Sequence, residues 1–406
     1  MKLAITVFCF VFPSLCIRAT TPTLRVHEWG TFTVVVGSDG SSVPWWTPTL
    51  EGPASLPEFV ARHALLQKAA APCLIRMETP VLYFYPSGPM TASVSVRYPA
   101  GQITEVFPTA PGFMRAPPLP SPLLHSLVSI ETPNSLLDAT PPTVWNITLR
   151  DPKEAVSLAK VPVVGDHGAH YRHAREVPDA WLVESDSQFE HFIFYRGTGN
   201  HYLPVNVVNT RDDIWEMGHT VVDTSHLRAF QVHVKGAQLR WAETPPIPRF
   251  GSAVAETSSS SDPAKFDSSQ SNLVKSLTTA LTEEGLTPAE AAAMVHTWED
   301  AWMKEDGTRL LVLLPQESID AVLPLSITPQ PAETRRVFVA RLELLNTTTE
   351  SHIGRLLDAW PNLSDEDKTF AKSLGRIKSA AFGRAVQIQH NKLLQRSGEV
   401  QAALEQ

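Results

Sequence analysis

The sequence predicts a mostly β protein, with an antiparallel sandwich-like domain followed by a smaller α/β region and C-terminal helices. Three observations predict it. Short runs of alternating apolar and polar residues recur from residue 24 to about residue 245, with little helical periodicity. Helical spacing of apolar residues begins only after a serine-rich stretch at residues 251–271. Strands at short spacing with turn residues between them are typical of sandwiches.

The strand predictions rest on alternation of side chains. In "TASVSVRYP", Val94, Val96 and Tyr98 share one face, and "FQVHVKG" alternates in the same way. "TPVLYFYP" and "EHFIFYRG" are apolar on both faces, as central strands are. Because the turn residues of "YPSGPM" join two apolar runs, we predict a hairpin from Pro80 to Pro99.

Helix signals appear in the last third of the chain. Thr287 is the predicted N-cap of a helix in which Pro288 fits the first position, Glu290 completes a capping box and Gly307 lies past the end. Two strands, "TRLLVLLP" and "RRVFVARLELL", follow this helix. A second capped helix begins at Ser364, so the chain is expected to end in helices.

The first residues predict export. Lys2 precedes an apolar run from Leu3 to Phe12, which is too short to span a bilayer and is typical of a signal peptide cleaved after Ala19. Leu15 stands where a lipid-attachment site needs a small residue, which disfavours lipidation of Cys16. The protein is therefore expected in the periplasm or the extracellular medium, and no later run predicts a transmembrane segment.

These signals divide the chain into five parts. We predict a signal peptide at residues 1–19, a β-sandwich-like domain at 20–250, a serine-rich linker or loop at 251–271, an α/β region at 272–346 and a C-terminal helical region at 347–406. The formal net charge of −8 without a basic stripe argues against a nucleic-acid partner. Cys73 is the one cysteine outside the signal peptide, so no internal disulfide is expected.

Several stretches, "HEWGTF", "RMETPVLYFY", "ITEVFP", "FIFYRGTGN" and "DGTRLLVLLP", together resemble a set of uncharacterised exported bacterial proteins. They are scattered over residues 27 to 315, so the resemblance covers most of the mature chain. It implies an exported bacterial protein with a shared fold. It implies no activity and supplies no catalytic residues.

Three glutamates are candidate catalytic groups, because each lies in or beside a strand among apolar residues: Glu28, Glu78 and Glu105. A buried carboxylate must pair, accept several hydrogen bonds or keep its proton. A protonated glutamate beside an ionised one is the acid–base arrangement of many hydrolases. The alternative is that each glutamate pairs with an arginine, for instance Arg76 or Arg97, or faces water.

Histidines suggest a metal site. Eight of the fourteen histidines lie between Asp166 and His233, and the candidate ligands of a divalent metal are His167, His170, His173 and His201. Neither helical nor strand spacing brings three of them together, so only a loop or distant strands could close a site. The alternative is a set of separate polar histidines.

Trp29, Trp45 and Trp46 are candidate ligand-binding aromatics, since "SVPWWTP" reads as a loop on which sugars or peptides could stack. The alternative is that they close the open end of the sheet. Because no catalytic motif is complete, the leading hypothesis is a non-enzymatic protein that binds a small molecule, glycan or peptide, or associates with the cell envelope. The second hypothesis is a hydrolase that uses buried glutamates or a histidine-bound metal.

Overall fold

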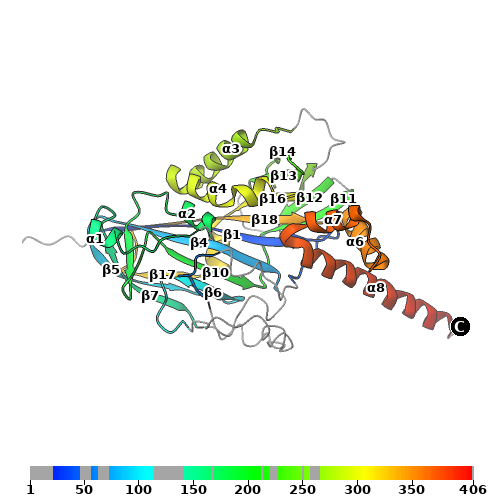
Figure 1. The fold of residues 1–406 in the computed structure, drawn as a ribbon, viewed down its shortest axis with the longest axis horizontal. Coiled ribbons are helices and arrows are strands. Elements are labelled where there is room, and N and C mark those ends of the chain that lie inside the picture. The colour runs from blue at the N-terminus through cyan, green and yellow to red at the C-terminus, as the bar shows by residue number, and fades with distance from the viewer. Residues whose placement is uncertain are drawn as a thin grey trace, which may run out of the picture.

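The predicted mostly β fold is confirmed by the computed structural model, which describes residues 22–45, 56–62, 73–113, 141–165, 168–211, 214–219, 227–248, 251–256 and 266–404. Three sheets make up most of the body, and the longer helices come from the last third of the chain (Figure 1). The expected signal peptide lies outside the described residues. No helix among the described residues is long and apolar enough to cross a bilayer.

A ten-stranded sheet forms the centre of the molecule. Its strands run in the order β14-β13-β16-β18-β1-β4-β10-β6-β3, and β2 pairs with β1. Among the described residues, all strand pairs of this sheet are antiparallel except β1 with β18, which run parallel. The bounds are β1 Leu24–Val36, β2 Ser42–Val43, β3 Ala61–Arg62, β4 Ile75–Pro86, β6 Gly101–Phe107, β10 Ile193–Gly199, β13 Ala229–Lys235, β14 Gln238–Glu243, β16 Gly307–Leu314 and β18 Glu333–Leu344.

The central sheet crosses the expected boundary between the domains. Strands β16 and β18 belong to the predicted α/β region, yet they lie between β13 and β1 of the predicted sandwich domain. The two regions therefore share this sheet, in which β18 pairs with β1 along its hydrogen-bonding edge. Part of the predicted serine-rich linker is also ordered, as strand β15, Ser252–Glu256.

Two smaller sheets pack on one face of the central sheet and share its hydrophobic core, as in a sandwich. One has the order β17-β5-β7-β8-β9 and the other β11-β12-β15. The bounds are β5 Met90–Val96, β7 Thr143–Arg150, β8 Leu182–Ser185, β9 Gln188–Glu190, β11 Val205–Arg211, β12 Ile214–His219 and β17 Leu325–Thr328. The predicted hairpin from Pro80 to Pro99 is wrong, because β5 pairs with β7 and β17 and the turn carries the chain from one sheet to another.

Helices cover the other face of the central sheet. Helices α2, α3 and α4 enclose a second core, and a third core lies beneath α6, α7 and α8. Figure 1 shows α3 and α4 over one face and α8 extending from the end of the molecule opposite α1. The bounds are α1 Ala155–Leu158, α2 Ala169–His173, α3 Gln270–Glu283, α4 Pro288–Met303, α5 Gln316–Val322, α6 Thr347–Ala359, α7 Asp365–Ser373, the short 3-10 helix η5 Gly375–Ile377 and α8 Lys378–Leu404.

The predicted capping of α4 is confirmed. The Thr287 side chain accepts a hydrogen bond from the Glu290 backbone, and the Glu290 carboxylate accepts one from the Thr287 backbone. The same carboxylate binds His27 Nδ1 at 2.9 Å and the Tyr85 hydroxyl at 2.5 Å. The N-terminus of α4 is thereby joined to β1 and β4.

Candidate functional site

A group of two histidines and one glutamate lies where α2 meets α4. His173 is the last residue of α2, and Glu176 follows it by three residues in the connection to β8. His296 lies in the middle of α4. The hydroxyl of its neighbour Thr297 donates to the Ala293 carbonyl at 2.8 Å and lies 3.4 Å from the carbonyl oxygen of His170, so the two helices are in contact at this point.

The three side chains converge on one point. His173 Nδ1 lies 2.9 Å from Glu176 Oε1, and His296 Nδ1 lies 3.1 Å from Glu176 Oε2. The three atoms that would bind a metal ion lie within 4.8 Å of one another. The imidazole rings are 5.7 Å apart between centroids and steeply inclined. We call His173, Glu176 and His296 the two-histidine–glutamate group.

The carboxylate of Glu176 carries the negative charge of this group. Partial burial raises the pKa of Glu176, but hydrogen bonds from the imidazoles of His173 and His296 outweigh that effect and hold the pKa below its usual value. The carboxylate is therefore ionised at neutral pH. All three side chains remain between about a third and a half exposed, so an ion from solvent has access.

The donor set suits a transition metal. Two imidazoles and a carboxylate are ligands of zinc in hydrolases and of iron, copper or nickel in other proteins. Three protein ligands leave at least one coordination position open to water or to another molecule. The group could therefore hold a metal that is still able to bind an outside ligand.

Of the four histidines predicted as metal ligands, the structure places only His173 in this group. His167 lies outside the described residues. His170 is half-buried one turn before His173, and burial together with nearby Arg196 lowers its pKa to about 4. His201 lies on the opposite face of the central sheet. There the Tyr98 hydroxyl oxygen is 3.2 Å from its Nδ1, and the Phe32 ring packs against its imidazole edge to face.

Glu28 has the arginine partner that a buried carboxylate requires. It is fully buried, and Arg336 Nε donates to its Oε2 at 2.5 Å while the Tyr195 hydroxyl donates to its Oε1. Arg336 also donates to Asp320 at 2.8 Å and to the carbonyl of Leu323 at 2.8 Å. The arrangement is a buried ion pair between β1 and β18. It matches the alternative given for this glutamate, namely pairing with an arginine rather than a catalytic role.

Glu78 and Glu105 lie on the other face of the sheet from Glu28. Tyr195, the partner of Glu28, and Arg196, 3.5 Å from Glu78, are consecutive residues of β10 and point to opposite faces. Glu105 is the strand neighbour of Arg196 and accepts a hydrogen bond from Thr104 at 2.5 Å. The three predicted carboxylates therefore do not form one site.

Glu78 belongs instead to a buried network of alternating charges. It accepts hydrogen bonds from Thr33 at 2.9 Å and from Arg376 at 3.3 Å. From Arg376 the ion pairs continue across the sheet through Glu305, Arg341, Glu343 and Arg309. Burial raises the pKa of Glu343, but its two arginine partners outweigh this and hold the pKa below its usual value. The network ties η5 to the central sheet.

The predicted aromatic ligand surface is wrong for the two tryptophans that the structure describes. Trp29 is fully buried in the core beneath α4, and Trp45 is buried with the Arg76 guanidinium 4.0 Å above its ring. Neither ring can stack on an outside ligand, because helices cover the face of the sheet on which both lie. Trp46 lies outside the described residues.

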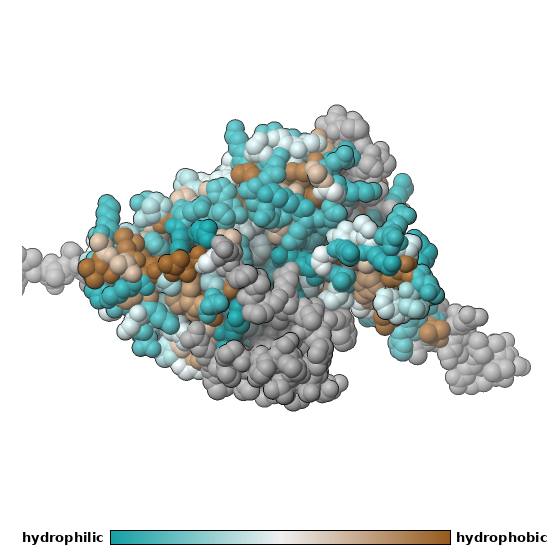
Figure 2. All heavy atoms as spheres, in the orientation of Figure 1, coloured by the Kyte–Doolittle hydropathy of each residue, from teal (hydrophilic) through white to brown (hydrophobic). Residues whose placement is uncertain are grey.

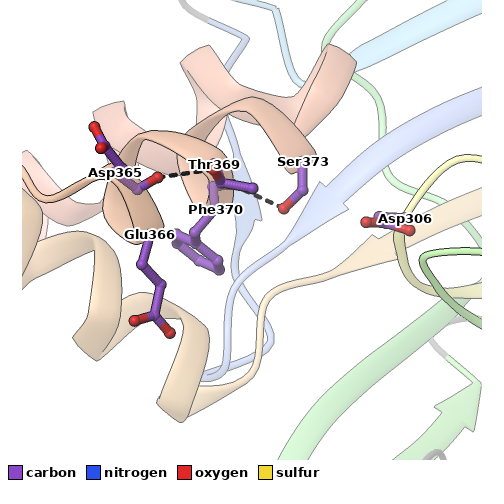
Figure 3. Close-up of a pocket in the computed structure, with 6 residues that line it drawn as sticks. All are labelled: Asp306, Asp365, Glu366, Thr369, Phe370 and Ser373. Carbon is purple, nitrogen blue, oxygen red and sulfur yellow. Dashed lines mark hydrogen bonds between the residues drawn. The ribbon is translucent and has the colours of Figure 1, made fainter.

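A shallow pocket of about 510 Å³ is lined by Asp306 and five residues of α7, none of which is a predicted site residue (Figure 3). Asp306 faces α7 across it, while the side chains of Asp365 and Glu366 point in different directions. The helix-borne carboxylates do not converge on a point at which a cation could be held. This pocket therefore does not offer a cation site comparable to the two-histidine–glutamate group.

His296 and Glu176 are the site residues that the sequence analysis did not select. The spacing of His173 and Glu176, three residues apart in "HARE", was a local signal that these side chains share a face. Nothing local marks His296, which lies 120 residues from Glu176 in the sequence. No protein-family model matches the chain, and no curated protein matches it.

Proposed function

We propose that this protein is exported and binds one divalent transition-metal ion through His173, Glu176 and His296. The observation that carries the proposal is the convergence of two imidazole nitrogens and one ionised carboxylate within 4.8 Å. The signal-peptide pattern at residues 1–19 and the likeness to exported bacterial proteins support the location. A non-enzymatic binding role is the simplest one that this group supports.

The competing explanation is a pair of surface ion pairs between Glu176 and protonated histidines. Such exposed pairs contribute about 0–1 kcal/mol and need no metal ion, because the two oxygens of a carboxylate can accept from two donors. With a metal ion, both imidazole nitrogens and one or both carboxylate oxygens would bind the same cation. The two explanations differ in whether the group binds Zn²⁺ at neutral pH.

The experiment is isothermal titration of tag-free, chelator-treated protein with Zn²⁺, together with metal analysis by mass spectrometry. We expect one ion per chain, bound at His173, Glu176 and His296. His296→Ala should weaken binding by roughly 100-fold or more, because a ligand is lost outright. Glu176→Gln should weaken it strongly as well, since the anionic ligand is replaced by a neutral amide.

The matched control is His352→Ala. His352 lies 3.3 Å from Asp367 on the surface, as an ordinary histidine–carboxylate pair. This variant should bind Zn²⁺ as tightly as the native protein. A stoichiometry near zero for the native protein, or equal affinities for the His296 and His352 variants, would refute the proposal.

A second candidate is metal-assisted hydrolysis, favoured by the open coordination position that three protein ligands leave. A bound metal at such a position lowers the pKa of water and supplies hydroxide near neutral pH. The test is hydrolysis of p-nitrophenyl acetate and p-nitrophenyl phosphate by the Zn²⁺-loaded and metal-free protein. Metal-dependent turnover that is lost in His296→Ala would support metal-assisted hydrolysis. Metal binding without turnover would support the non-enzymatic binding role instead.

A further inference from the structure

Arg196 on β10 is a buried cation with one weak contact. Its side chain is 9 % exposed, and its one ion contact among the described residues joins Nη2 to Glu78 Oε1 at 3.5 Å. Its Nε is buried and has no hydrogen-bond partner in the part of the chain that the structure describes. A guanidinium carries five N–H donors, and its bonds to a carboxylate are usually about 2.7–2.9 Å long. Arg196 therefore has donors that the described residues leave unused.

The two carboxylates beside Arg196 each have another arginine. Glu78 accepts a hydrogen bond from Arg376 at 3.3 Å. Glu105 stands opposite Arg196 in the pairing of β6 with β10, and Arg62 stands opposite Glu105 in the pairing of β3 with β6. The described residues thus give Arg196 no carboxylate of its own. Because a buried charge without a close partner is costly, this position favours an added anion.

A threonine hydroxyl on the neighbouring strand β1 is also without a partner. Thr31 is fully buried, and its Oγ1 has no hydrogen-bond partner among the described residues. Thr31 stands opposite Glu78 in the pairing of β1 with β4. Two residues further on, Thr33 donates to the Glu78 carboxylate at 2.9 Å. Since residues two apart on a strand share a face, Thr31 lies on the same face as Glu78 and Arg196.

Helix α2 brings an imidazole to this face of the sheet. The Tyr171 ring of α2 packs against the Phe194 ring, 5.1 Å between centroids, two residues before Arg196 on β10. His170 precedes Tyr171 and is partly exposed. Burial and, after it, the positive charge of Arg196 lower the pKa of His170 to about 4, so its imidazole is neutral at pH 7. A neutral imidazole offers one N–H donor and one acceptor.

The strands are irregular at the level of these residues. The pairing of β1 with β4 shifts between Trp29 and Thr31, and the pairings of β10 with both its neighbours shift just before Gly197. Thr79 on β4 has a φ of 54°, in the left-handed region that β-branched residues rarely adopt. Bulges of this kind redirect side chains and are frequent beside functional sites. Here they lie beside Arg196 and Thr31.

We propose that Arg196, Thr31 and His170 bind an oxyanion, the carboxylate or phosphate group of a small ligand. A guanidinium suits such a group because its N–H donors can bind two oxygens at once. The hydroxyl and the neutral imidazole can each donate one further hydrogen bond. His170 gives access from solvent, and Figure 2 shows mostly hydrophilic surface where α2 and α4 lie in Figure 1. We call these three residues the Arg196 site.

The test is isothermal titration of the metal-free protein with inorganic phosphate and, separately, with acetate at a fixed ionic strength set by chloride. We expect one saturable site per chain for at least one of the two anions. Phosphate binding alone would assign a phosphate ligand, and acetate binding alone a carboxylate. Arg196→Met should weaken binding at least roughly tenfold, because the charge-assisted hydrogen bonds are lost. Glu78 keeps its bonds from Thr33 and Arg376 in this variant, so the fold should persist.

The matched control is Arg150→Met. Arg150 pairs with Glu184 at 2.7 Å, and its side chain is 42 % exposed on β7 in another sheet. The control removes the same charge outside the Arg196 site, so it should bind the anion as the native protein does. No saturable binding by the native protein, or equal affinities for Arg196→Met and Arg150→Met, would overturn the proposal.

A second variant keeps the charge of the site. Thr31→Val removes only the hydroxyl and breaks no hydrogen bond among the described residues, so a thermal melt should show unchanged or higher stability. We expect anion binding weakened roughly threefold or more, because one hydrogen bond to the ligand is lost. If Arg196→Met does not fold, unchanged affinity in Thr31→Val overturns the proposal. Because no metal is present in these titrations, this proposal and the Zn²⁺ proposal can fail separately.

Discussion

Replacing Arg336 with methionine should destabilise the protein strongly. Arg336 is the buried partner of Glu28, with Nε 2.5 Å from Oε2, and both residues are at most 2 % exposed. Without the guanidinium, a carboxylate would stay in the core with only the Tyr195 hydroxyl to bind it. Breaking a buried pair in this way costs about 3–5 kcal/mol. That is a large part of the 5–15 kcal/mol that typically separates folded from unfolded states.

The neighbouring residue supplies a matched control. Arg335 precedes Arg336 on β18 and forms an exposed pair with Glu333 at 2.9 Å. Because solvent screens this pair, Arg335→Met should cost about 0–1 kcal/mol. The two variants remove the same charge and add the same side chain one residue apart, so they differ mainly in burial.

The assay is urea unfolding followed by circular dichroism, with comparison of midpoints at an unchanged slope. The double variant Glu28→Gln/Arg336→Met leaves no unpaired charge in the core. Its loss of unfolding free energy should therefore be smaller than the sum of the losses in Glu28→Gln and Arg336→Met. If Arg336→Met costs no more than Arg335→Met, the conclusion that Glu28 depends on its ion pair is refuted.

Two further predictions concern the packing on either face of the central sheet. Burial lowers the pKa of His201 from 6.5 to about 4, so its contribution to stability is complete above pH 6.5 and is lost as the pH falls toward 4, by about 3 kcal/mol at most. His201→Phe should flatten this decline when urea midpoints are compared at pH 7 and pH 4.5, and an unchanged decline would exclude His201 as its cause. Gly197→Ala should cost about 1–3 kcal/mol or more, because the added Cβ would lie 2.3 Å from the backbone oxygen of Gln102. Gly354→Ala, which meets nothing within 4 Å on helix α6, should instead leave thermal stability equal or higher, and similar melts for the two variants would contradict the packing argument.

Local sequence patterns predicted most of the elements, because the signals for them are local. The alternation in "FQVHVKG" places Phe230, Val232 and Val234 in the core, as expected. The capping box of Thr287 and Glu290 marks the start of α4 correctly. Side-chain direction along a strand and hydrogen bonds at a helix end depend on neighbours within four residues, which a sequence displays directly.

The burial of the tryptophans could not be predicted from local sequence patterns. Trp29 alternates with Glu28, so a sequence shows that they face opposite sides of a strand. It does not show that both sides are covered, one by smaller sheets and the other by helices. Burial on both faces depends on elements from distant parts of the chain, and the prediction of exposed aromatic rings failed for that reason.

The sequence by itself determined most of the strands and the capped helices, since each rests on residues a few positions apart. Tertiary structure alone decided that Arg336, 308 residues from Glu28, completes its ion pair and that His296 joins the two-histidine–glutamate group. The physical reason is that a charge or a ligand acts through space over a few ångströms. Which residues come within that distance is set by the order of strands in the central sheet and by the docking of α4 against it.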